Sequence, residues 1–329
     1  MQGREGSRRG ILASLAAAPL GLAALRARAQ QEAPWPNRPI TIVAPYPPGG
    51  TTDLSVRPIA PRLGELLGQS IVIENRAGAG GSIGANFVAQ SRPDGHTLLA
   101  FPTAVLTISQ HIMDLPYRPE TAFEPVCMTS VAYGIVVAHP SVPFRDVPGL
   151  IAYAKANPGR LRFGSAGNGT ITQLSGEMFA EAAGIRLEHV PYRGSAPSLT
   201  DLLAGRIQLL FDPVAVPAVR DGRLIALATN AETRNPLLPE VPTLRELGLQ
   251  KAEAIPWFGI AAPAGVPRPV IARLTEAIRI ALEAPEVAQA MLQMAMSPAF
   301  EAGEAFAARI RRERETYGAV VRRIGASAN

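Results

Sequence analysis

The sequence of 329 residues has little of what most catalytic and metal sites require. It holds one cysteine and four histidines. A single cysteine excludes an intramolecular disulfide, and Cys127 lies in the apolar stretch 126–128, so we expect a buried, unreactive thiol. The histidines are scattered, without H-x-H or H-x-x-x-H spacing, so we predict no metal site.

The usual cofactor and nucleophile motifs are also missing. The run GAGGSIG has Ile83 where a dinucleotide fingerprint needs its third glycine, and GSAGNGT lacks the lysine of a P-loop. No G-x-S-x-G elbow surrounds any serine. We therefore predict a protein without a cofactor that is not an enzyme. A secreted α/β enzyme stays open as an alternative, because a nucleophile and base that meet only in the fold leave no sequence signature.

Basic charge is concentrated at the N-terminus. Five of the 32 lysines and arginines but only one of the 27 acidic residues fall in the first 29 positions, so the remainder is nearly neutral. A near-neutral body gives no reason to expect nucleic acid or an anionic membrane surface as a partner.

Residues 1–29 have the pattern of an export signal. An arginine-rich start precedes the apolar run Ile11–Leu25, and Ala27-Arg28-Ala29 offers a cleavage site. The run is shorter than the roughly 20 residues that span a bilayer. We predict a soluble periplasmic protein cleaved near Ala29. Because residues 7–12, SRRGIL, are similar to a twin-arginine signal, that route and the ordinary secretory route both stay open.

Short apolar runs alternate with helical patterns after the signal. Strands are predicted at Ile40–Ala44, Ile71–Glu74, Thr97–Ala100, Gly134–Ala138, Leu161–Gly164, Leu187–Pro191, Ile207–Phe211 and Ile225–Thr229. Helices are predicted at Thr172–Ala183, Pro197–Ala204, Pro269–Leu282 and Gly303–Arg323, and a first helix containing Pro58 and Pro61 is expected to bend or start late. This alternation indicates an α/β fold with βαβ units and parallel sheet.

Two long extended apolar stretches, 123–139 and 254–263, are typical of crossings between lobes. They predict a discontinuous first lobe, 33–128 plus 255–329, and a second lobe, 129–254. In an open α/β sheet, ligands bind at the carboxyl ends of strands. Five loops rich in Gly, Ser and Thr fall there and favour a shared polar cleft: 45–52, 76–82, 102–103, 164–170 and 192–195.

Several of these motifs together resemble a known family. They are PYPPGGTTD (45–53), ENRAGAGGSIGA (74–85), PDGHTLL (93–99), FGSAGNGT (163–170), HVPYRGSAPSLTDLLAG (189–205) and WFGIAAPAGVP (257–267). In this order they are similar to the Bug, or tripartite tricarboxylate transporter, family of extracytoplasmic solute receptors, over about residues 35–328.

The resemblance implies a two-lobed type 2 periplasmic binding protein fold, each lobe a mostly parallel sheet flanked by helices, joined by two crossing strands. It implies a monomer that captures a small carboxylate in the cleft for the permease subunits of a tripartite tricarboxylate transporter. A ligand-presenting sensor component is the alternative. The residues that the resemblance places at the ligand are Tyr46, Gly50, Thr51, Thr52, Gly80, Gly81, Ser82, Thr103, Ser165, Ala166, Asn168, Thr170, Tyr192 and Asp212.

Two positions and the lack of an arginine cluster narrow the chemical class of ligand that we expect. The loop at Thr103 has fewer hydroxyl groups than is usual in the family, which suggests a more apolar ligand body. An aspartate equivalent to Asp212 lies in the ligand cavity of some members, where it can receive an ammonium group. The cleft loops hold no cluster of arginines, so we expect a mono- or dicarboxylate rather than a tricarboxylate.

Overall fold

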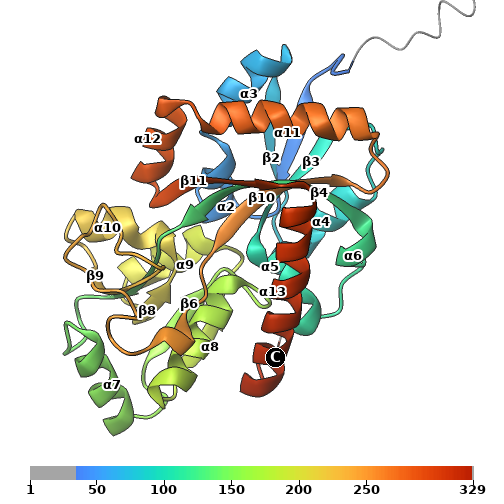
Figure 1. Ribbon diagram of the computed structural model, residues 1–329. Coiled ribbons are helices and arrows are strands. Elements are labelled where there is room, and N and C mark those ends of the chain that lie inside the picture. Colours follow the sequence, from blue (N-terminus) through green and yellow to red (C-terminus); the bar gives the residue numbers. More distant parts are fainter. Residues whose placement is uncertain (1–34, 328–329) are drawn as a thin grey trace, which may run out of the picture. The chain divides into compact units, whose positions relative to one another are not determined.

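The computed structural model describes residues 35–327, and its strands form two sheets (Figure 1). The six-stranded sheet has the order β11-β4-β10-β3-β1-β2 and the five-stranded sheet the order β7-β6-β8-β5-β9. The strands are β1 Ile40–Ala44, β2 Ile71–Asn75, β3 Thr97–Pro102, β4 Phe123–Ala132, β5 Gly134–Ala138, β6 Arg162–Ser165, β7 Glu188–Pro191, β8 Leu209–Phe211, β9 Ile225–Asn230, β10 Trp257–Pro263 and β11 Met296–Ala302.

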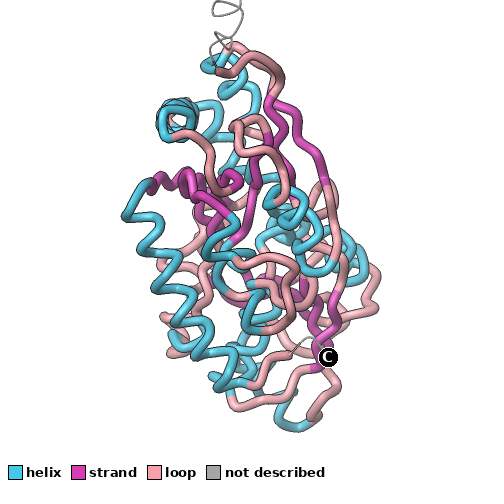
Figure 2. Tube along the Cα trace, turned by 90° about the vertical axis from the view of Figure 1, so that its right-hand side faces the viewer, coloured by secondary structure: helices cyan, strands magenta, loops and turns pink. Residues whose placement is uncertain are grey.

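Helices and loops surround these strands, as the rotated view of Figure 2 shows. The α-helices are α2 Thr51–Val56, α3 Ala60–Leu67, α4 Ser82–Ala89, α5 Thr103–Thr107, α6 Pro119–Ala122, α7 Val147–Ala156, α8 Ile171–Ala183, α9 Ser195–Leu203, α10 Val216–Arg220, α11 Arg268–Leu282, α12 Pro285–Gln293 and α13 Gly303–Ile324. Single 3-10 turns are η1 Ala79–Gly81, η2 Ser109–His111, η3 Pro213–Ala215 and η4 Gln250–Ala252. None of the helices within residues 35–327 is long and apolar enough to cross a membrane.

Both sheets are mixed, so the expectation of mostly parallel sheets needs correction. In the six-stranded sheet β1 pairs in parallel with β2 and β3, but β4, β10 and β11 are joined by antiparallel pairs. In the five-stranded sheet β6 pairs in parallel with β7 and β8, whereas β5 pairs antiparallel with β8 and β9. Four of the strands in antiparallel pairs, β4, β5, β9 and β10, adjoin the points where the chain passes from one sheet to the other, and a strand that arrives by a crossing is not bound to the βαβ direction. The antiparallel edge strand β11 follows α12 instead.

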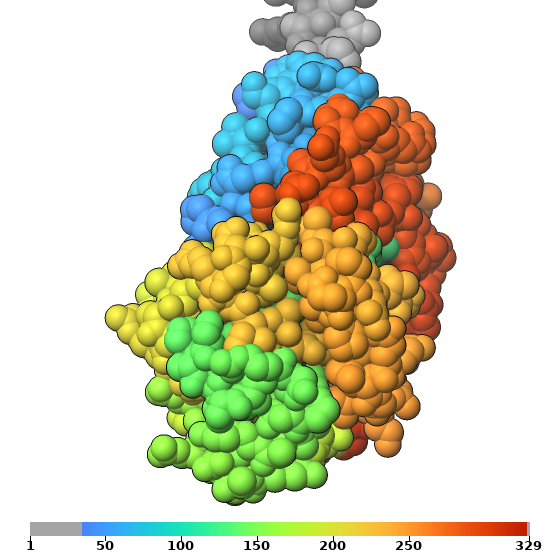
Figure 3. Space-filling model, turned by 90° about the vertical axis from the view of Figure 1, so that its left-hand side faces the viewer, coloured from blue at the N-terminus to red at the C-terminus, as the bar shows by residue number. Residues whose placement is uncertain are grey.

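The chain makes two passages between the sheets. Strand β4 of the six-stranded sheet is followed, after Tyr133 alone, by β5 of the five-stranded sheet, and residues 231–256 lead back from β9 to β10. As a result, segments from both ends of the chain, blue and orange to red, lie together in Figure 3, beside the middle segments in green to amber. The lobe limits at residues 128/129 and 254/255 stay a prediction.

Each sheet has its own apolar core. Val43, Leu99, Phe101, Trp257 and Phe306 pack around the six-stranded sheet. Around the five-stranded sheet the core includes Val136, Phe163, Phe179, Phe211 and Leu227. These runs of large buried side chains fix the sheets and leave the carboxyl ends of their strands free to carry polar loops.

Three details differ from the sequence-based expectation or fall outside the description. The helix with Pro58 and Pro61 is interrupted, giving α2 and α3 with a break at residues 57–59, as proline inside a helical pattern requires. Strand β11 was not predicted. The predicted signal, residues 1–29, lies outside the described residues.

Candidate functional site

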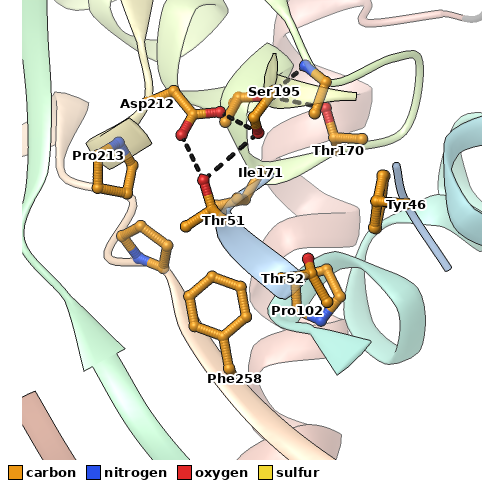
Figure 4. Close-up of a pocket in the computed structure, with 13 residues that line it drawn as sticks. Tyr46, Thr51, Thr52, Pro102, Thr170, Ile171, Ser195, Asp212, Pro213 and Phe258 are labelled. Carbon is orange, nitrogen blue, oxygen red and sulfur yellow. Dashed lines mark hydrogen bonds between the residues drawn. The ribbon is translucent and has the colours of Figure 1, made fainter. Parts of the chain in front are cut away.

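The carboxyl ends of strands from both sheets surround one small cavity (Figure 4). Thr51 and Thr52 open α2 after β1, and Thr170 is the N-cap of α8 after β6. Ser195 opens α9 after β7, and Asp212 caps η3 after β8. The whole lining is Tyr46, Thr51, Thr52, Pro102, Ala166, Thr170, Ile171, Thr172, Ser195, Asp212, Pro213, Pro256 and Phe258.

The local sequence explains why these chain segments approach so closely. Gly81 has φ 96°, and a Cβ there would lie 2.9 Å from the Tyr46 hydroxyl oxygen. A Cβ on Gly80 would lie 2.3 Å from the Asn168 carbonyl oxygen, so only glycine lets the loops of the two sheets touch here. Ser109 of η2 adds a cross-link by donating to the Gly169 carbonyl at 3.0 Å. The loops of both sheets are thus held together around the cavity.

Asp212 is the electrostatic centre of the cavity. Its Oδ1 accepts hydrogen bonds from Thr51 Oγ1 at 2.7 Å and from the Val214 backbone N–H at 3.0 Å, and its Oδ2 accepts from Ser195 Oγ at 2.5 Å. Because Thr51 belongs to the six-stranded side and Asp212 to the five-stranded side, these bonds join the two sides. Burial raises the pKa of the Asp212 carboxyl, and the three donors oppose that effect without reversing it.

No lysine or arginine is among the described residues that line the cavity. The cavity is small, with a volume of about 30 Å³. That is room for only a few waters as the loops stand. The surface that the walls expose to the cavity is mostly apolar, from residues such as Pro102, Ile171, Pro213, Pro256 and Phe258, with threonine and serine hydroxyls set among them.

Tyr46 separates this cavity from a second one. Its hydroxyl donates to the Gly80 carbonyl at 2.6 Å, and burial, followed by the nearby Tyr117 and Asp212, raises its pKa. Tyr46 and Ala166 line both spaces. The second cavity has a volume of about 470 Å³. Its other lining residues are Gly78, Ala79, Gly80, Gly81, Ser82, Met113, Asp114, Gly167, Asn168, Pro191, Tyr192 and Arg193.

The predicted site residues divide among these places. Six line the central cavity: Tyr46, Thr51, Thr52, Ala166, Thr170 and Asp212. Gly80, Gly81, Ser82, Asn168 and Tyr192 line the neighbouring cavity instead. Ser195, Ile171, Thr172 and the apolar wall were not among the predicted contacts.

Three predicted residues lie at neither cavity. Thr103 Oγ1 donates to the Trp257 carbonyl and accepts from the Trp257 N–H, at 3.0 and 2.9 Å. Ser165 Oγ lies 2.6 Å from His189 Nε2 and accepts from the Gly167 N–H at 3.1 Å. Gly50 caps α2 and packs near Ser195. These groups hold strands and loops in place.

No group of histidine, cysteine and acidic side chains in residues 35–327 could hold a metal ion. The central cavity is lined by hydroxyl groups and by the starts of α2, α8 and α9. Such groups bind anions by hydrogen bonding.

A family comparison decides what kind of protein this is. The model of the tripartite tricarboxylate transporter family receptors matches residues 56–326. The chain belongs to this family. By the family's description its members are receptors rather than enzymes, and the resemblance found in the sequence motifs is confirmed.

Individual relatives of this tripartite tricarboxylate transporter receptor support the same family assignment. A protein of Pseudomonas sp. strain P51, the UPF0065 protein in the tcbD-tcbE intergenic region, is 38% identical over 325 residues, covering 98% of this chain and 96% of the relative. An R. palustris structure with adipate has 32% identity and a TM-score of 0.85 and covers 89% of this chain and 99% of that one. MatC from Rhodopseudomonas palustris, with bound malate, has 30% identity and a TM-score of 0.81 and covers 87% and 100%. The two-sheet α/β fold of this receptor is therefore that of solved members of the family.

Proposed function

We propose that this receptor works in the periplasm, where it captures a small mono- or dicarboxylate in the central cavity and does not transform it. The observation that carries the proposal is the cavity itself, in which hydroxyl groups and helix starts from both sheets face one space. The relatives solved with adipate and malate support a carboxylate as the ligand.

Binding is proposed to be non-covalent. The first N–H groups of α8 have no partner within the helix, and a carboxylate oxygen is the acceptor that they favour. Each charge-assisted hydrogen bond contributes about 1.5–3 kcal/mol. Because the polar groups come from both sides of the cavity, the complete set of donors exists only when the two sides meet. Ligand therefore favours the closed arrangement.

The further steps follow from the same proposal. The N-terminal segment directs export and is removed near Ala29. The loaded receptor then delivers its ligand to the membrane permease subunits of a tripartite transporter. The family's description supports this destination.

The test is a melting experiment on the chain from Gln30 onward, unfolded and refolded to remove any bound ligand. A ligand that binds only the folded state raises the melting temperature by mass action. We expect at least one acid from a panel of small mono- and dicarboxylates to raise it, whereas the corresponding neutral amide does not. Equal shifts for acid and amide, or no shift with any acid, would contradict carboxylate capture.

A further inference from the structure

A further cavity lies beside the two passages of the chain between the sheets. It has a volume of about 570 Å³, whereas the central cavity has about 30 Å³. Sites for small molecules range from about 300 to 1,000 Å³. We call it the passage cavity: it is lined by residues 131–133 at the first passage, by residues within 231–257 at the second, and by parts of α8 and α13. None of the described residues lines both this cavity and the central one.

The sequence of α13 places one face of that helix along the passage cavity. The lining residues recur three or four positions apart, as one face of an α-helix requires: Arg309, Glu313, Thr316, Tyr317 and Val320. Figure 1 shows α13 running from the six-stranded sheet to the side of α8. There Arg323 pairs with Glu181 of α8 at 3.0 Å, and Val320 and Met178 belong to one apolar cluster. The walls of the cavity therefore come from both sides of the fold.

Much of the wall is aromatic or apolar. Tyr133, at the first passage, and Tyr317, of α13, line it together with Met178 and Ile255. Tyr317 is mostly buried, and burial raises the pKa of its hydroxyl. That hydroxyl makes no hydrogen bond within the described chain, so a bound molecule can supply the missing partner. Aromatic rings also attract organic cations.

The charged groups at the passage cavity are mainly acidic. Glu232, Glu253 and Glu313 line it, and Arg309 is the one basic side chain among the lining residues described. Arg309 is already engaged, because it donates to Glu301 and pairs with Glu313 at 3.3 Å. The described wall therefore has an excess of negative charge and no uncommitted cation for an anionic ligand.

Glu232 is the carboxylate at this cavity without a cation of its own. It lies two residues after β9, is exposed, and forms no hydrogen bond or ion pair within the described chain. Arg245, which interacts with it electrostatically, is paired with Glu253 at 2.6 Å. Glu232 thus leaves a negative charge at the edge of an aromatic and apolar cavity, where it would attract a positive group of a ligand.

We propose that the passage cavity is a separate binding site for a small organic cation with an aromatic or apolar body. The charged group of the cation lies at Glu232, and its body lies against Tyr133, Met178 and Tyr317. The inference goes beyond carboxylate capture and does not rest on it, because the two cavities share no described lining residue. An occupant contacts both passages that connect the sheets, so its binding favours the arrangement of the sheets seen here.

Calorimetry on the refolded chain from Gln30 onward tests the inference with three probes of similar size: 2-phenylethylamine, 2-phenylethanol and 2-phenylacetamide. Only the amine is charged at neutral pH, and none is a carboxylate, so the outcome is independent of capture in the central cavity. We expect the amine to bind at least about tenfold more tightly than either neutral probe. A neutral probe that binds as tightly as the amine, or an amine that does not bind, would overturn the cation site.

A matched pair of variants tests the role of Glu232. Glu232→Gln removes only the charge and should weaken binding of the amine about fivefold. Glu240→Gln changes an exposed glutamate of the same segment that does not line the cavity, so it should leave the affinity unchanged. Equal affinities in the two variants would overturn the assignment of the charged group to Glu232.

A third variant locates the bound amine. Val320→Trp fills the passage cavity from α13 and should abolish binding of the amine. Wild-type affinity in Val320→Trp, or a loss in Asp212→Asn without one in Val320→Trp, would place the amine elsewhere and overturn the inference. The two exposed glutamate variants decide the question even if Val320→Trp fails to fold.

Discussion

Two buried aspartates at helix starts differ in their hydrogen-bond partners, and the comparison separates a structural role from a candidate functional one. Asp53, in the first turn of α2, is 1% exposed, and Asp212, the cap of η3, is 0% exposed. Asp53 receives two hydrogen bonds from Arg57, at 2.7 and 2.8 Å, and others from the Gly49 N–H and Asn75. Asp212 receives its bonds from hydroxyl groups and one amide.

The difference is the counter-charge. Burial works to raise the pKa of Asp53, but Arg57, the Gly49 N–H and Asn75 outweigh it and the pKa is lowered. At Asp212 burial prevails and the pKa is raised. Asp53 therefore stabilises the Pro/Gly-rich loop before α2, whereas Asp212 lies at the cavity with hydroxyl and amide partners and no cation beside it. A buried charge with a cation indicates structure, and one without a cation is a candidate for function.

Replacing each aspartate in turn with asparagine should give the largest difference in the free energy of unfolding. Asp53→Asn removes a charged partner of Arg57 and should lower the free energy of unfolding by about 2–3 kcal/mol. Asp212→Asn removes a buried charge that has no cation, so its loss should stay within about 1 kcal/mol. Urea unfolding of both variants measures the difference, and equal losses would remove the distinction drawn here.

The adjacent threonines sharpen the comparison on a smaller scale. Thr51→Val takes a donor from buried Asp212 and should cost about 1–2 kcal/mol of stability. Thr52→Val removes a hydroxyl without a protein partner and should be neutral or slightly stabilising, within about 0.5 kcal/mol. The same unfolding measurement applies. A larger loss in Thr52→Val than in Thr51→Val would show that the donor assignment is reversed.

The smallest effects are the opposite pH dependences of the two carboxyls. An unfolded aspartate has a pKa of about 3.9. The lowered pKa of Asp53 gives stability that is present above this value and lost as pH falls through the folded-state pKa. The raised pKa of Asp212 gives stability that is present below this value and lost as pH rises through the folded-state pKa.

These opposite signs can be read from differences between each variant and the wild type. The amount by which Asp53→Asn lowers the free energy of unfolding relative to the wild type should shrink as pH falls below about 4. The stability of Asp212→Asn relative to wild type should increase as pH rises above about 4. Unfolding free energies across this range provide the measurement, and parallel curves for the two variants would contradict the assigned directions.

Much of the fold could be predicted because buried strands are apolar runs between turn residues. Strands β1 and β5 have the predicted bounds, and β2, β3, β6, β7, β8 and β9 differ only at their ends. Strand β11 was not predicted because it contains Pro298 and Glu301 and is mostly half-exposed, as edge strands often are. Its place is set by pairing with β4, which no local pattern reveals.

The candidate site was less predictable because residue type does not give side-chain direction. Thr52 and Thr103 both lie in the first turn of a helix that follows a strand, yet Thr103 bonds to the backbone of Trp257 and Thr52 lines the cavity. Ser195 could have been predicted as a cavity residue, since it ends a glycine-containing loop at a helix start. Nothing in the local sequence predicts Phe258 at the cavity, because its place depends on the pairing of β10 with β3, which sets it opposite Pro102.

Trp257 gives this receptor an optical reporter of its own. The indole is 2% exposed and donates through Nε1 to Glu313 at 2.7 Å, edge-on to Phe101 and Phe306. It stands between Pro256 and Phe258, which both line the cavity, and the sequence has only one other tryptophan. A shift of this segment changes the contact between the indole and its carboxylate. We therefore expect the emission of Trp257 to change when the cavity is occupied, which would report binding without any attached dye.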